Sequence, residues 1–344
     1  MARTHLRTRL RTHPVTRRLA AGTAALVATG ALLSGCALGT AGGYVPAGQL
    51  TGDLTDLEGA LDGAQITVGS KNFNENVILG KMAIILMRAA GAEVEDLTNI
   101  PGSAAARQAH EVGQIDAMWE YTGTGWITYL GETEPIPDEQ EQYEAVRDVD
   151  LEQNQLVWLP PAPMNNTYAF AMNPEVTERL GIESMSQLAE LPVEERTFCV
   201  ESEFTNRPDG LPGMLETYGI PLNEADGTPE SNLRTYQTGA IYDATARGEC
   251  NFGEVFTTDG RILALDLTVL TDDQEYFPKY NVSLVLTEAI AEDYPEIEDL
   301  MAPMTEKLTD EVLLELNARV DVDGEEPAEV AYEWLEEEGF VTSS

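Results

Sequence analysis

The chain has 344 residues, of which 60 are acidic, 20 are basic and three are histidines, for a formal net charge of −40. Such an acidic protein repels the phosphate backbone, so nucleic acid is disfavoured as a partner. The same charge keeps a protein soluble where salt screens its self-repulsion. A salty habitat and an ordinary solvated surface both remain open as its origin.

The N-terminus has the composition of an export signal. The first 18 residues hold six arginines and no acid, and the apolar stretch LAAGTAALVATGALLSG follows them. This stretch has signal-peptide length and is too short for a stable membrane span. It ends in Leu-Ser-Gly-Cys, which resembles the lipobox of bacterial lipoproteins, whose cysteine is lipidated and becomes the first mature residue.

The leader predicts where the protein resides. We expect a lipoprotein signal peptide at residues 1–35, a lipid anchor on Cys36 and an extracytoplasmic location on the outer face of the bacterial cell membrane. An uncleaved anchor or a plain secreted protein is the alternative. Cleavage leaves 14 basic residues against 60 acidic ones, a formal charge of −46.

Residues 36–63 are rich in glycine, alanine and threonine, which predicts a flexible tether before an ordered domain that begins near Gln65. From there, apolar periodicity predicts strands and helices in alternation, at residues 66–70, 74–91, 92–100, 102–113 and 114–121. Asn74 is available to cap the first helix and Gly91 to end it. This alternation is typical of a parallel sheet.

The same alternation begins again at residues 166–173 and runs to about residue 260, which predicts a second α/β lobe. A further strand at residues 281–290 precedes acidic amphipathic helices at residues 297–308, 309–320 and 327–340. We expect these helices to pack back on the first lobe. Their acidic runs are expected to be solvated helix faces rather than binding sites.

Two cysteines remain in the mature chain, Cys199 and Cys250, and each lies in a strand-like run. An extracytoplasmic location permits a disulfide between them. Sequence alone does not show whether the two strands are neighbours. A disulfide and two buried free thiols therefore remain alternatives.

The sequence lacks the motifs of several common classes of enzyme. His110 is the one histidine beyond the leader, and it lies in a predicted helix, where we expect it on the surface. The sequence has no Gly-x-Ser-x-Gly elbow, no His-Glu-x-x-His and no phosphate-binding glycine-rich loop. We therefore expect no catalytic residue, no metal site and no cofactor. A cell-surface enzyme with a carboxylate pair is the weaker alternative.

Two polar or aromatic segments follow strands of the first lobe. Lys71 comes after the first predicted strand, and Tyr121 to Thr124 come after the strand run IDAMWE, within WEYTGTGW at residues 119–126. Ligands of parallel sheets bind at the carboxyl ends of the strands. Both segments are therefore expected at one ligand-binding edge.

Six motifs carry a family resemblance: GSKNFNEN, DAMWEYTGTGW, MNNTYAF, ESEFTNRPDG, GEVFTTDGRI and TDDQEYFPKYNVSLVL. Through them, residues 64–340 resemble the substrate-binding proteins of ABC transporters for compatible solutes, the glycine betaine, carnitine and choline binders. The resemblance implies a two-lobed periplasmic-binding-protein-like fold (type II). Two α/β lobes are joined by two crossovers, near residues 166–168 and 281–283, with a ligand cleft between them.

The implied domains are lobe 1 at residues 64–167 and 283–344 and lobe 2 at residues 168–282. The implied partners are a small quaternary ammonium ligand, the permease subunits of an ABC importer and the membrane, through the lipid anchor. The protein is expected to be monomeric.

The resemblance also implies an aromatic cage of Tyr121, Tyr168, Phe256 and Tyr280. A trimethylammonium group donates no conventional hydrogen bond, so it is recognised by apolar contact and by the negative faces of rings. The family commonly has tyrosine at the position of Phe256. Phenylalanine keeps the ring face there but lacks the hydroxyl, so affinity or ligand preference is expected to shift.

The family's partners for a ligand carboxylate match Lys71, Thr124 and Arg207, and arginine suits that role through its planar fork of donors. A choline-selective receptor is the alternative within the family. The ligand remains open among glycine betaine, proline betaine, carnitine, ectoine and choline. Trp119 and Trp126 are expected in the core, and Tyr242 is expected to pack on a helix face.

Overall fold

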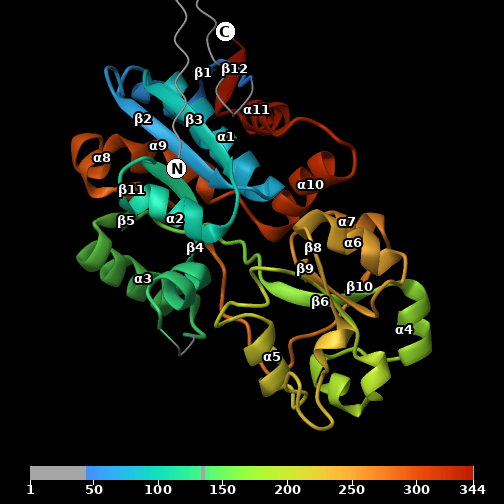
Figure 1. Cartoon of the computed structure of the whole chain (residues 1–344). Helices are drawn as coiled ribbons and strands as arrows, with labels where there is room; N and C mark the ends of the chain where they lie inside the picture. The colour runs from blue at the N-terminus through green and yellow to red at the C-terminus, as the bar shows by residue number, and fades with distance from the viewer. Residues whose placement is uncertain (1–43, 133–135, 344) are drawn as a thin grey trace, which may run out of the picture. The chain divides into compact units, whose positions relative to one another are not determined.

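A computed structural model of the chain describes residues 44–132 and 136–343. They contain two five-stranded sheets with helices around them, as a two-lobed α/β fold requires (Figure 1). Lobe 1 is the part built on the sheet ordered β3-β2-β4-β11-β5, and lobe 2 is the part built on the sheet ordered β10-β6-β9-β7-β8. The predicted signal peptide and lipidation site, Cys36, lie outside the described residues.

The sheet of lobe 1 is mixed rather than fully parallel. Strands β2, β3 and β4 run parallel, as the alternating pattern predicts, whereas β11 runs antiparallel to both β4 and β5. The chain reaches β11 directly from lobe 2, without the crossover helix that imposes a parallel return. The strands are β2 (Gln65–Lys71), β3 (Glu93–Ile100), β4 (Ala117–Tyr121), β5 (Leu156–Trp158) and β11 (Val282–Thr287).

Helix α1 (Asn74–Ala89) is the central helix of lobe 1, and its side chains are buried almost all round. It contacts β2 and β3 on one side and the C-terminal helices on the other, because an apolar surface on every face must be covered on every face. Gly91, with a φ of +106°, follows its end as predicted. The predicted Asn74 cap is wrong, since the N-cap is Phe73 and the Asn74 amide instead donates to Asp321.

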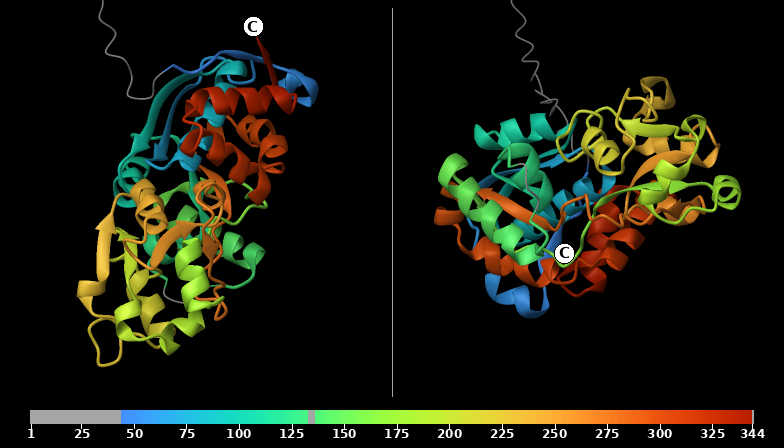
Figure 2. Two further views of the ribbon diagram at one scale, coloured as in Figure 1. Left: turned by 90° about the vertical axis from the view of Figure 1, so that its right-hand side faces the viewer. Right: turned by 90° about the horizontal axis from the view of Figure 1, so that it is seen from below.

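The acidic C-terminal helices pack on lobe 1, as predicted. Their apolar faces are buried against α1, and Figure 2 shows the red C-terminal segment beside the blue-to-cyan one in two further views. The helices of lobe 1 that follow α1 are α2 (Ser103–Glu111), η2 (Thr124–Tyr129), α3 (Glu139–Asn154), α8 (Glu288–Asp293), α9 (Glu296–Thr305), α10 (Asp310–Asp321) and α11 (Pro327–Glu337).

Residues 48–61 lie in the segment for which the sequence predicts a tether, and here the structure differs. Strand β1 (Gly48–Leu50) pairs antiparallel with β12 (Val341–Ser343), and helix η1 (Gly52–Leu57) follows it. Leu50, Leu54 and Leu61 are buried in the main core. Burial of these leucines outweighs the flexibility of the surrounding glycines and threonines, so this segment closes one side of lobe 1.

Lobe 2 has its own mixed sheet, in which β7 runs parallel to β8 and β9 while β6 runs antiparallel to β9 and β10. Cys199 of β7 and Cys250, just before β9, form a disulfide, which decides between the two alternatives. The elements are β6 (Tyr168–Met172), α4 (Pro174–Leu180), η3 (Met185–Glu190), η4 (Val193–Glu195), β7 (Phe198–Glu201), α5 (Leu211–Thr217), η5 (Glu230–Asn232), β8 (Leu233–Tyr236), α6 (Thr238–Ala246), β9 (Phe252–Phe256), α7 (Arg261–Ala264) and β10 (Thr268–Val269).

The chain passes between the two sheets twice, at residues 159–167 and 270–281. The first passage ends beside β6 and the second leads into β11, where the resemblance implies the two crossovers. A side chain of each passage forms a hydrogen bond with the backbone of the other passage. Asn281 Nδ2 donates to Met164 O over 2.9 Å, and Asn165 Oδ1 accepts from Tyr280 N over 2.8 Å. The two crossovers are thus tied to each other.

Candidate functional site

One cavity of about 360 Å³ is lined by residues of both lobes. The structure brings all seven residues that the sequence predicts as ligand-binding to its wall: Lys71, Tyr121, Thr124, Tyr168, Arg207, Phe256 and Tyr280. They come from the ends of β2, β4 and β9, the starts of β6 and η2, and the loops before α5 and β11.

The WEYTGTGW segment reaches the cavity because it can approach the second crossover closely. A Cβ on Gly123 would lie 2.6 Å from Lys279 O and 2.9 Å from the Tyr280 ring, distances that only glycine avoids. Thr122 N donates to Asn281 O over 3.0 Å. This glycine therefore lets the end of β4 and the Tyr280 loop form one wall.

Aromatic rings form a continuous part of the wall. The Tyr168 ring centroid lies 5.2 Å from that of Phe256 and 5.5 Å from that of Tyr280. The Phe73 centroid lies 5.6 Å from that of Phe256 and 5.8 Å from that of Tyr121. Phe73 is thus a cavity ring that sequence reasoning missed, although it stands in the GSKNFNEN motif two residues after Lys71.

Lys71 lies under these rings with its charge already compensated. Its Nζ is 2.5 Å from Glu120 Oε1 and 4.6 Å from the centroid of the Tyr121 ring. Glu120 also accepts from Tyr121 N and from Tyr129 Oη, each over 2.8 Å. With these three donors, the buried Glu120 side chain holds the lysine ammonium against the ring wall.

Arg207 is also paired at the cavity. Its Nε and Nη2 donate to the two oxygens of Asp209 over 2.8 and 2.6 Å, in the bidentate geometry that arginine favours. Asp209 accepts in addition from Tyr280 Oη over 2.7 Å, and Arg207 Nη2 lies 3.4 Å from Thr124 Oγ1. The guanidinium carbon lies 5.5 Å from the Tyr168 ring centroid. Asp209 thus positions both the Tyr280 ring and the Arg207 guanidinium.

Glu75 joins the cage to the crossover and to lobe 2. This fully buried carboxyl accepts from Tyr121 Oη and Asn166 Nδ2 over 2.7 and 2.8 Å, and from Thr258 Oγ1 and Asn317 Nδ2 over 2.6 and 3.0 Å. Burial raises the pKa of Glu75 in spite of these four hydrogen bonds. The network fixes the Tyr121 ring from behind.

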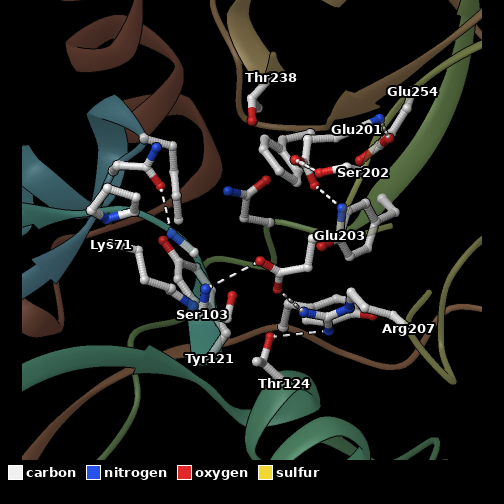
Figure 3. Close-up of a pocket in the computed structure, with 18 of the residues that line it drawn as sticks. Lys71, Ser103, Tyr121, Thr124, Glu201, Ser202, Glu203, Arg207, Thr238 and Glu254 are labelled. Carbon is white, nitrogen blue, oxygen red and sulfur yellow. Dashed lines mark hydrogen bonds and ion pairs between the residues drawn. The ribbon is translucent and has the colours of Figure 1, made fainter. Parts of the chain in front are cut away.

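The wall opposite the lysine is acidic. Glu201, Glu203 and Glu254 line the cavity together with Ser202, and Figure 3 shows them around one side of it. Burial raises the pKa of Glu254 to about 8, against the effect of a 2.7 Å hydrogen bond from Glu201 N. The site therefore contains more carboxyl groups than cations, a feature that the sequence analysis missed because acids are frequent along the whole chain.

Other residues singled out in the sequence lie away from the cavity wall. Trp119 is buried in the main core, as predicted, and Trp126 packs half-buried beside α3 and β5. Tyr242 of α6 packs under Arg261, with 4.2 Å between its ring centroid and the guanidinium carbon.

The prediction of a surface histidine is wrong. His110 shares the inner face of α2 with Ala106 and is 1% exposed. Burial lowers its pKa to about 4.

Within residues 44–132 and 136–343, no group of three or more His, Cys, Asp or Glu side chains is arranged to hold a metal ion. In the same part of the chain, no helix is both long enough and apolar enough to cross a membrane. The cavity of the described residues combines aromatic rings, paired cations and carboxyl groups.

The sequence matches a known family over most of its length. Residues 64–337 match the model of the substrate binding domain of ABC-type glycine betaine transport systems. The glycine-betaine-binding protein of Pseudomonas aeruginosa is 37% identical over 280 residues, which cover 79% of this chain and 87% of that protein. The glycine betaine-binding protein YehZ of Escherichia coli is 30% identical over 286 residues, which cover 80% and 91% of the two chains.

Solved structures agree in fold. A structure described as a glycine betaine/carnitine/choline ABC transporter superposes with a TM-score of 0.65 at 26% identity, over 80% of this chain and 99% of the other. Apo YehZ of Escherichia coli superposes with a TM-score of 0.60 at 28% identity, with the same coverage. The two-lobed type II fold is confirmed, and the chain belongs to the family of substrate-binding domains of ABC-type glycine betaine transport systems.

Proposed function

We propose that this protein is a lipid-anchored receptor, held outside the cell by Cys36, that captures glycine betaine or a related quaternary ammonium osmoprotectant and delivers it to the permease of an ABC importer. The observation that carries the proposal is the ring wall of the cavity, in a chain that belongs to this family. The receptor acts as a monomer and performs no covalent chemistry on its ligand.

The rings hold the ammonium group. Tyr121, Tyr168, Phe256, Tyr280 and the added Phe73 present faces or edges to one cavity, and a methylated ammonium gains both apolar contact and attraction to the ring quadrupoles. Desolvation in a cavity strengthens that attraction, to about 2 kcal/mol for a ring. No protein donor is needed for this half of the ligand.

The cations hold the carboxylate of a betaine. Lys71, Arg207 and Thr124 line the same cavity, and each has hydrogen-bond donors. Lys71 and Arg207 reach the cavity with Glu120 and Asp209 already bound to them, so a ligand carboxylate joins an existing ion pair. A choline-selective receptor is the second candidate, which the surplus of carboxyl groups in the cavity wall favours.

Isothermal titration of the protein with glycine betaine and with choline tests the proposal. We expect saturable binding of glycine betaine, weakened about five- to thirtyfold by Tyr168→Leu, because one ring contributes about 1–2 kcal/mol when desolvated. Tyr168→Phe keeps the ring and is the matched control, expected within about threefold of the original affinity. Binding of neither ligand by a folded protein rejects the proposal, and binding of choline alone selects the second candidate.

A further inference from the structure

The Glu203 side chain reaches across the cavity from lobe 2 to lobe 1. Its Oε2 accepts from Ser103 N over 3.1 Å, and its Oε1 lies 3.3 Å from Arg207 Nη1 (Figure 3). Ser103 is the first residue of the nine-residue helix α2, whose N-terminal N–H groups favour an anion. The glutamate therefore occupies a place that has both a backbone donor and an arginine donor.

That place is the one a zwitterionic ligand needs. Glycine betaine carries its carboxylate one methylene away from the ammonium, so a carboxylate beside the rings must find its donors within the same cavity. The Ser103 N–H is taken by Glu203, and the Arg207 fork is shared between Asp209 and Glu203. A second carboxylate placed there meets a like charge, and this repulsion opposes its binding.

Glu203 is the most exposed of the three carboxylates that form ion pairs with Lys71 and Arg207. Its side chain is 33% exposed, whereas those of Glu120 and Asp209 are each 2% exposed. Its two contacts are long, whereas Asp209 accepts three hydrogen bonds of 2.6 to 2.8 Å.

Glu203 is held in its charged form. Burial alone would raise the pKa of Glu203, but the hydrogen bond from Ser103 and the charges of Arg207 and Lys71 outweigh it, so the pKa lies below its ordinary value. A charged carboxylate in this place competes with another carboxylate and attracts a cation.

We propose that Glu203 is a specificity-determining residue, an internal competitor that occupies the carboxylate position between Ser103 and Arg207 in the unliganded protein. It lowers the affinity for zwitterionic quaternary ammonium ligands and leaves the affinity for choline-like cations intact. The inference rests on the proposed function, since it concerns the ligands of that same cavity.

Titration of glycine betaine and choline into the original protein, Glu203→Gln and Glu203→Ala tests this role. We expect both variants to bind glycine betaine about tenfold more tightly, because the repulsion of a like charge is removed. For choline, we expect the affinity of both variants either to stay within about threefold of the original value or to fall. Glu216→Gln, which removes an exposed charge from α5 in the same lobe, is the matched control and leaves both affinities unchanged.

The outcomes separate this inference from the function beneath it. Equal losses of affinity for both ligands would identify Glu203 as a clasp between the lobes and overturn the inference, as would an unchanged affinity for glycine betaine in both variants. Thermal denaturation of each variant shows that the fold is retained. If the original protein and all variants bind neither ligand, the proposed function itself fails and the inference fails with it.

Discussion

Glu254 is the cavity residue whose charge depends most directly on the pH of the solution. It is buried at the cavity wall beside Glu201, and it has one backbone hydrogen bond from Glu201 N. Its pKa of about 8 places its titration near neutral pH. The carboxyl is therefore largely protonated near neutral pH, and it can donate a hydrogen bond to a ligand as well as accept one.

The raised pKa predicts a pH-dependent stability. A carboxyl whose pKa rises from 4.5 in the unfolded chain to about 8 in the folded one stabilises the protein fully below pH 4.5. That contribution is lost as the pH rises through about 8, with a slope of at most about 1.4 kcal/mol per pH unit. We expect the free energy of unfolding of the original protein, relative to Glu254→Gln, to fall between pH 5 and pH 9.

Urea unfolding of both proteins at pH 5, 7 and 9 measures this difference. Glu216→Gln, an exposed acid in the same lobe, is expected to show none of it. A constant difference between the original protein and Glu254→Gln across the pH range would mean that Glu254 stays charged in the folded state.

At this scale, the sequence predicts the cavity residues that stand in distinctive motifs. Tyr121, Tyr168, Arg207 and the other four predicted residues all lie at the cavity. Glu203 and Glu254 were not predicted, because their effect depends on distance and burial, and one glutamate among so many acids carries no local signal. Phe73 does have a local signal in the sequence, because it stands between the end of a strand and the start of a helix.

At the scale of elements, the segment of β1 and η1 shows how composition and spacing compete. Its glycines and threonines indicate a tether, but Leu50, Leu54, Leu57 and Leu61 recur every three or four residues, which is the spacing of one buried helical face. Three of the four are buried in the main core. The pairing of β1 with β12 joins residues almost 300 positions apart, and no local pattern predicts it.

This segment predicts a large effect of a single leucine. Leu54→Ala should lower the free energy of unfolding by about 2–5 kcal/mol, the usual cost of deleting a buried leucine side chain. Leu54 is 2% exposed, whereas the neighbouring Asp56 is exposed, so Asp56→Ala should change stability by less than about 0.5 kcal/mol. Chemical denaturation of the two variants compares them. Equal, small effects would mean that the segment is the tether its composition suggests.

The disulfide and the mixed sheets mark the same limit. Sequence places Cys199 and Cys250 in strand-like runs, but only the fold of lobe 2 shows that β7 and β9 are neighbours. Likewise, β11 runs antiparallel to β4 because of the path of the second crossover, and the residues of β11 do not by themselves predict this direction. Local patterns predict the elements well because periodicity is local, and the order of strands in a sheet is not.

At the scale of the whole molecule, the dominant property is charge. Beyond residue 35 the chain has 14 basic residues against 60 acidic ones, and many of the acids lie on exposed faces of the C-terminal helices. Like charges at this density destabilise the compact state through self-repulsion. Salt screens buried ion pairs such as Lys71 with Glu120 much less than it screens surface charges, so added salt weakens the surface repulsion more than it weakens these pairs.

Self-repulsion predicts that added salt stabilises the protein. Raising NaCl from 0.01 to 0.15 M shortens the Debye length from about 30 to about 8 Å, which weakens repulsion between surface carboxylates more than it weakens contact ion pairs. We expect Tm at pH 7.5 to rise by several degrees over this range, as measured by scanning calorimetry. At pH 4.5 many carboxylates are protonated, so the same addition of salt should produce a clearly smaller rise. A Tm that is flat or falls with salt at pH 7.5 would show that attractive surface pairs, rather than the net charge, govern the stability of the whole molecule.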